Sequence, residues 1–137
     1  MSNTPTYAEP EEVMALVRDP NKIAGKDYVI IDVRGDDYIG GHIPGSVNVP
    51  AGRIYDEVNQ LIEKYSQIPI IYFHCALSQV RGPKSARIYS ETLQNLGVKT
   101  DQKVKILRYG FEGWHLRYKL EKDLIEDYDA SVWEWAT

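Results

Sequence analysis

Short apolar runs along the chain alternate with segments in which apolar residues recur every three or four positions. The runs at residues 28–33, 68–73 and 104–107 are rich in β-branched residues, which is typical of buried strands. The segment 34–50 is dense in Gly and Pro and predicts a long ordered loop, with a short strand at 46–49. The pattern therefore predicts strands separated by longer connections.

Helical spacing occupies most of these connections. In residues 9–19, Val13, Leu16 and Val17 lie on one face, and the predicted helix ends before Pro20. The same spacing recurs in 54–65 and between Pro83 and Gly97, at Ile54, Val58, Leu61, Ile62 and Tyr65 and at Ala86, Tyr89, Leu93 and Leu96. The last strand runs through the turn "RYGFEGW" into a short helix.

Strands that alternate with helices predict an α/β fold, with a parallel sheet flanked by helices on both faces. The chain has 137 residues, 43% of them hydrophobic, which is enough for one domain with a sizeable core and leaves no room for a second. We find no internal repeat and no low-complexity linker.

Charge and composition exclude several classes of function. The net charge of -4 argues against a nucleic-acid partner, because such binding needs clustered Lys and Arg. The longest apolar stretch is too short to span a bilayer, and the first residues lack a signal-peptide pattern, so no membrane partner is expected. The single cysteine excludes an internal disulfide and a CxxC zinc site. We expect a soluble intracellular protein. The expected location is the cytoplasm, and the nucleus is a second candidate location.

The candidate chemistry centres on Cys75, which follows the predicted strand at 68–73. Ligands of parallel α/β sheets gather at the carboxyl ends of strands. Backbone N–H groups of the following loop, together with the start of the next helix, would bind a tetrahedral oxyanion. Arg81 would close this cradle with a planar fork, and the positive environment would favour a nucleophilic Cys75 thiolate. The predicted substrate-binding residues are Ala76, Leu77, Ser78, Gln79, Val80 and Arg81.

Each of these residues also has a structural interpretation. Cys75 would then be a small buried hydrophobe, and Arg81 a surface ion-pair partner. The Ser78 hydroxyl would support either the thiolate or the loop, or would face solvent. His74 precedes the sulfur and points to the other side of the strand, which favours a role in fixing the strand end over a role as catalytic base.

The motif "HCALSQVRGPKSA" resembles the active-site signature of the rhodanese-fold M-phase inducer phosphatases and of the related yeast-type arsenate reductases. The segments "IIDVRGDDYIGGHIPGSVNVP" and "ILRYGFEGWHLRY" are similar to further parts of that domain. The chain looks most like the small single-domain fungal phosphatases of this group. The resemblance implies a rhodanese-like domain over residues 8–118, followed by a C-terminal tail, 119–137, packed on the domain.

By this resemblance the chain is a cysteine-dependent protein phosphatase of the tyrosine or dual-specificity type. Related sulfurtransferases usually have a loop one residue shorter than the five residues between Cys75 and Arg81. The implied substrate is a phosphorylated protein, the intermediate a phosphocysteine, and no cofactor or metal is required. Two alternatives remain open, namely an arsenate reductase that uses glutathione and glutaredoxin, and a noncatalytic rhodanese module that binds phosphopeptides or handles sulfur.

The sequence departs from these phosphatases in two ways. Its loop holds no carboxylate, so the general acid is unassigned among Glu112, Asp36, Asp37 and the phosphate's own proton. Val33 stands where those phosphatases place a second cysteine, so rescue of oxidised Cys75 would need an external thiol such as glutathione.

The resemblance also implies structural roles for five residues outside the loop. The pair formed by Asp32 and Arg34 is expected to stabilise the segment after the first predicted strand, with His42 and Asn48 in the same scaffold. Trp114 is expected in the core.

Overall fold

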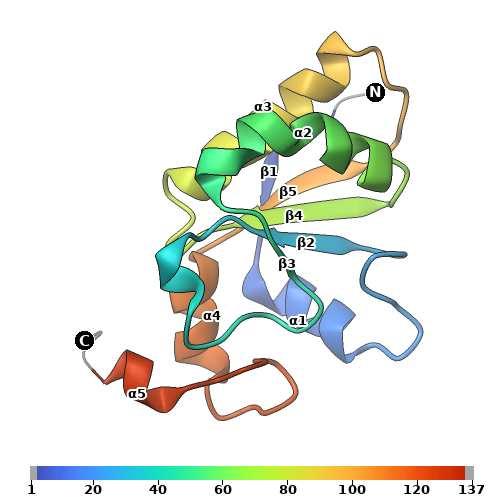
Figure 1. The fold of residues 1–137 in the computed structure, drawn as a ribbon. Helices are drawn as coiled ribbons and strands as arrows, with labels where there is room; N and C mark the ends of the chain where they lie inside the picture. The colour runs from blue at the N-terminus through green and yellow to red at the C-terminus, as the bar shows by residue number, and fades with distance from the viewer. Residues whose placement is uncertain (1–2, 135–137) are drawn as a thin grey trace.

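The computed structural model describes residues 3–134 and contains one sheet of five parallel strands (Figure 1). The strand order is β1-β5-β4-β2-β3. The strands are β1 (Thr6–Ala8), β2 (Val29–Asp32), β3 (Val47–Asn48), β4 (Ile70–His74) and β5 (Lys103–Leu107). The helices are α1 (Pro10–Arg18), α2 (Ala51–Tyr65), α3 (Arg81–Asn95), α4 (Gly110–Tyr118) and α5 (Ala130–Trp133), with a short 3-10 turn η1 (Asp36–Tyr38).

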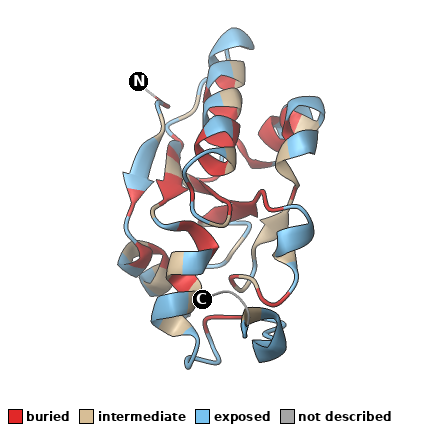
Figure 2. Cartoon of the chain, turned by 90° about the vertical axis from the view of Figure 1, so that its left-hand side faces the viewer, coloured by how far each residue is buried: buried red, intermediate tan, exposed pale blue. Residues whose placement is uncertain are grey.

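Helices cover both faces of the sheet, which confirms the predicted α/β architecture. The helices α2 and α3 lie on one face, and α1 and α4 lie on the other (Figure 1). Each face has its own hydrophobic cluster, and Figure 2 shows the buried residues gathered along the sheet and on the helix surfaces turned toward it. Trp114 is fully buried in the cluster beneath α4, as expected.

Several boundaries differ from the prediction. The edge strand β1 was not predicted, because Thr6 and Tyr7 are not buried and only three residues pair with β5. The helix α2 begins at Ala51, where the backbone N–H donates to the Val33 carbonyl, and α3 begins at Arg81 rather than near Pro83. Leu96 was predicted on the apolar stripe but is exposed, since it lies past the end of α3.

The segment after α4 lies against the domain. Leu124 and Ile125 are buried, and the indole N–H of Trp114 donates to the Leu124 carbonyl. Trp133 of α5 donates to the Gly40 carbonyl and stacks on His115. The second tryptophan of the tail, at position 135, lies outside the described residues. Within residues 3–134, no helix has the length and apolar character that a bilayer crossing requires.

The strand order creates a crevice at the carboxyl ends of β2 and β4. These two strands are neighbours, and Asp32 pairs in register with His74 at their ends. After β4 the chain continues to β5, toward one edge of the sheet, and after β2 it continues to β3, at the opposite edge. Connections that diverge in this way open a ligand crevice between them.

Candidate active site

Cys75 lies at this crevice, directly after β4, with its sulfur turned toward the first turn of α3. The Sγ atom accepts hydrogen bonds from the backbone N–H groups of Ser78 at 3.2 Å and Gly82 at 3.3 Å. A Cβ atom at position 82 would lie 3.3 Å from the backbone N of Cys75, so glycine lets the start of α3 approach the strand end. Sequence reasoning missed Gly82, although it stands in the quoted "RGP" motif.

The loop between Cys75 and Arg81 folds its middle inward. Ser78 has a left-handed backbone, with φ of 56°, and is only 3% exposed, so the solvent-facing interpretation of this serine is wrong. Its Oγ atom has no hydrogen-bond partner among the described residues. Leu77, Gln79 and Val80 are exposed and Ala76 is half-buried.

Arg81 forms a two-point ion pair with Asp37 of η1. Its Nη1 and Nη2 atoms lie 3.0 and 2.7 Å from the two carboxylate oxygens, and both side chains are partly exposed. The hydrogen bonds from Arg81 hold the pKa of Asp37 below its usual value. The same two bonds, accepted by Asp37, raise the pKa of Arg81, and the nearby Cys75 sulfur adds to this effect. Arg81 therefore forms the kind of ion pair that its structural interpretation predicts. This pair lies close to the Cys75 thiol.

A buried ion pair supports the segment that carries Asp37. Arg34 is 1% exposed and donates to both carboxylate oxygens of Asp32, as expected from the resemblance. Its remaining donors reach the carbonyls of Asp37 at 3.0 Å and Gly41 at 2.9 Å, and the Asn48 amide donates to the carbonyls of Asp32 and Arg34. This network anchors the segment after β2 to the core.

His42 lies in the same segment after β2 and connects this segment to the C-terminal tail. Its backbone N–H donates to the Glu126 carbonyl, and its ring stacks on Tyr38.

His74 contacts the backbone rather than the Cys75 sulfur. Its Nδ1 atom lies 3.1 Å from the Cys75 carbonyl oxygen, on a fully buried ring that stacks against Phe111. Burial lowers the pKa of His74, outweighing the attraction of Asp32, so the ring is neutral at physiological pH. These contacts fit a residue that fixes the strand end.

The start of α4 holds the other side of the loop. The backbone N–H groups of Phe111 and Glu112 donate to the carbonyls of Cys75 and Ala76, at 2.9 and 2.8 Å. Gly110 has φ of +59°, and a Cβ atom there would overlap those same two carbonyl oxygens. Sequence reasoning assigned no role to this glycine; the quoted "YGFEG" turn was the available signal.

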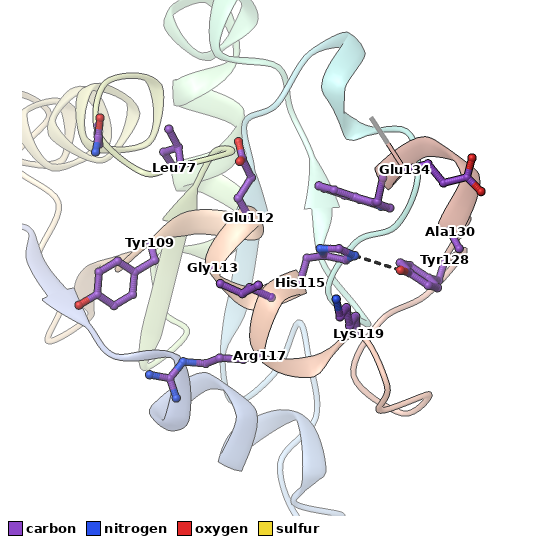
Figure 3. A pocket seen from close by; sticks show the side chains of 13 residues that line it. Leu77, Tyr109, Glu112, Gly113, His115, Arg117, Lys119, Tyr128, Ala130 and Glu134 are labelled. Atoms are coloured by element: carbon purple, nitrogen blue, oxygen red, sulfur yellow. Dashed lines mark hydrogen bonds between the residues drawn. The ribbon is translucent and has the colours of Figure 1, made fainter. Parts of the chain in front are cut away.

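Two cavities flank the loop and share Glu112 and Trp133. One, of about 410 Å³, lies in front of Ala76, and three carboxylates line it, those of Asp36, Asp37 and Glu112. The other, of about 800 Å³, is a groove along α4 (Figure 3). Leu77, Tyr109, His115, Leu116, Tyr128 and Trp133 contribute to its lining. Among the described residues, no three His, Cys, Asp or Glu side chains are grouped as metal ligands would be.

The chain is similar to known proteins that are named for two different activities. The model of the rhodanese-like domain matches residues 9–117. The dual specificity phosphatase ibp1 of Schizosaccharomyces pombe is 36% identical over 90% of this chain and 98% of its own length. Arsenate reductase 2.2 of Oryza sativa subsp. japonica is 31% identical over 85% of this chain and 86% of its own. Among solved structures, Ygr203w, described as a yeast protein tyrosine phosphatase of the rhodanese family, is 25% identical and superposes with a TM-score of 0.78, covering 98% of this chain and 99% of the other.

Proposed function

Because the chain belongs to the rhodanese-like domain family, with phosphatases and arsenate reductases among its relatives, we propose that it is a cysteine-dependent protein phosphatase of the tyrosine or dual-specificity type. The observation that carries the proposal is the setting of Cys75, whose Sγ accepts hydrogen bonds from the backbone N–H groups of Ser78 in the loop and Gly82 in the first turn of α3. Arg81, the first residue of α3, stands next to Gly82. Backbone donors and an arginine fork are the groups that stabilise a transferring phosphoryl.

The reaction consists of two displacements at phosphorus. The Cys75 thiolate forms an S–P bond while the ester P–O bond breaks, and the leaving oxygen takes a proton. Water then attacks phosphorus, which breaks the S–P bond, releases inorganic phosphate and regenerates the thiolate. The amides of residues 76–81 and the Arg81 guanidinium bind the phosphoryl oxygens in both steps.

The structure narrows the choice of proton donor for the first step. The pair with Arg81 lowers the pKa of Asp37, so this carboxyl is ionised at neutral pH and is a poor general acid. Glu112 lines both cavities beside the loop, and Leu77 lines the larger of them with it (Figure 3). Glu112, Asp36 and the phosphate's own proton remain the candidates.

The test compares wild type with Cys75→Ser on p-nitrophenyl phosphate and on a phosphotyrosine peptide. We expect wild type to hydrolyse both without consuming glutathione, and the serine variant to lose turnover, because a serine hydroxyl does not ionise near neutral pH. Equal turnover by the serine variant would exclude the thiolate mechanism.

The second candidate function is arsenate reduction, favoured by the rice relative named above. The same cradle would hold arsenate on the Cys75 sulfur, and glutathione would supply the electrons, being oxidised as arsenate is reduced to arsenite. Wild type is therefore also assayed with arsenate, glutathione and glutaredoxin. Arsenate-dependent oxidation of glutathione together with negligible ester hydrolysis would replace the phosphatase proposal with this one.

A further inference from the structure

We propose that Asp37 is a positioning residue, which holds the Arg81 guanidinium by one edge and leaves its other edge for an oxyanion at Cys75. This inference rests on the proposed function, since it concerns the same reaction. It assigns a task to an ion pair that joins residues 44 positions apart in the sequence.

The donors of the guanidinium allow both contacts at once. The pair with Asp37 is end-on, because its two bonds come from the terminal nitrogens Nη1 and Nη2. Such a pair uses one N–H on each terminal nitrogen and leaves the Nε–H and the remaining terminal N–H groups. The free side edge is itself a fork that matches two oxygens of a phosphoryl or arsenate group. Arg81 directly precedes Gly82, whose backbone N–H donates to the Cys75 Sγ at 3.3 Å, so the arginine extends from the backbone beside the sulfur.

The position of Asp37 is itself fixed from two directions. Its Oδ1 atom accepts from the Gly35 backbone N–H at 3.0 Å, which orients the carboxylate. Its carbonyl accepts from Nη1 of the buried Arg34, whose guanidinium is paired with Asp32 and lies 4.2 Å from the Phe111 ring centroid. A continuous set of contacts therefore runs from the core through Arg34 and Asp37 to Arg81. An ion pair formed only for stability would not need this support, because partly exposed pairs contribute little.

Asp36 offers a matched control. It neighbours Asp37 in the sequence and lines the same cavity, so its neutralisation changes the local charge equally. The described structure shows no contact between its side chain and Arg81. The experiment measures inorganic phosphate binding by calorimetry, and kcat and KM for p-nitrophenyl phosphate, in wild type, Asp37→Asn, Asp36→Asn and Asp37→Glu.

For Asp37→Asn we expect phosphate binding to weaken and kcat/KM to fall, each by about 10- to 100-fold, because a misaligned Arg81 loses charge-assisted bonds to the oxyanion. Its melting temperature should stay within about 4 °C of wild type, since the pair is exposed. Asp36→Asn should change phosphate binding less than about 3-fold, because its side chain does not contact Arg81 and its exposed charge is screened. Asp37→Glu keeps the carboxylate and should recover part of the loss.

Other results would overturn the inference. Unchanged or tighter phosphate binding in Asp37→Asn would mean that the carboxylate is irrelevant to the fork or competes for it, while the proposed function would stand. An equal loss of phosphate binding in Asp36→Asn would assign the effect to charge alone. If wild type itself neither bound phosphate nor hydrolysed the ester, the proposed function would fail, and the inference with it.

Discussion

Arg81 illustrates how the identity of a single side chain bears on the proposed chemistry. Its guanidinium binds a carboxylate at two points, and the proposed reaction requires it to bind a phosphoryl group with its remaining donors. A lysine ammonium is a point charge without a planar fork and satisfies at most one of these demands well. The shape of the cation therefore matters as much as its charge.

We predict that Arg81→Lys lowers kcat/KM for p-nitrophenyl phosphate by about 100-fold or more, which corresponds to the loss of at least one charge-assisted bond in the transition state. Arg87→Lys makes the same chemical change at an exposed position of α3 and should leave the rate unchanged. Steady-state kinetics of both variants check this, and full activity in Arg81→Lys would remove Arg81 from the site.

Cys75 is the only thiol of the chain, and Val33 packs in the same core cluster. The Val33 backbone N–H donates to the His74 carbonyl, which places Val33 beside the strand end that precedes Cys75, and the valine side chain offers no sulfur there. We predict that peroxide drives Cys75 irreversibly to sulfinic acid, and that glutathione present during exposure prevents this by forming a mixed disulfide. Mass spectrometry after peroxide treatment measures the product. Full recovery on later addition of a reductant, without glutathione during exposure, would contradict the prediction.

At the scale of elements, the loop is held between the starts of two helices. The helix α3 approaches through Gly82, and α4 approaches through Gly110, whose neighbours donate to the carbonyls of Cys75 and Ala76. The geometry of the nucleophile therefore depends on backbone contacts that tolerate no Cβ atom at position 110. A substitution at position 110, which is distant from Cys75 in the sequence, should therefore affect the proposed reaction at Cys75.

We predict that Gly110→Ala destabilises the fold by about 2–4 kcal/mol, from the cost of a left-handed backbone and the displaced hydrogen bonds. It should also lower activity more than its unfolded fraction explains. Gly52→Ala is the control, because nothing lies within 4 Å of a Cβ atom there, and it should be neutral or stabilising by up to about 1 kcal/mol. Denaturant unfolding and activity at matched folded fraction test both variants. Equal stabilities would show that α4 does not need this close approach.

At the scale of the whole molecule, the buried charges beneath the site make stability depend on pH. Burial would raise the pKa of Asp32, but the attraction of His74 once its ring is protonated in acid, together with the hydrogen bonds and charge of Arg34, outweighs burial and lowers that pKa. Burial lowers the pKa of His74 as well. For each group, the folded state disfavours protonation relative to the unfolded chain, so stability is present at higher pH and is lost as pH falls.

We predict that the free energy of unfolding decreases as pH falls below about 6.5, the usual histidine pKa, and decreases again below about 4, where Asp32 begins to protonate in the unfolded chain. In His74→Asn, which keeps a neutral side chain, the first decrease should shrink while the second remains. Urea unfolding between pH 7.5 and 3 measures both decreases. An unchanged slope in the variant would assign the decrease to the other histidines.

The sequence by itself determined most of the helices and strands, the edge strand β1 excepted, and the position of the candidate loop, because both depend on local residue order. Apolar runs and helical spacing predicted the three main strands and the packing of helices on both faces of the sheet. The spacing from Cys75 to Arg81, followed by Gly-Pro, indicated the anion-binding loop and the family of the chain. Only the tertiary structure revealed the pair between Arg81 and Asp37, the inward Ser78 and the approach of Gly110 to the loop. The pair and the Gly110 approach join segments that are distant in the chain, and the order of the parallel strands decides which of them meet. The inward Ser78 depends on a left-handed backbone that residue identity alone does not predict.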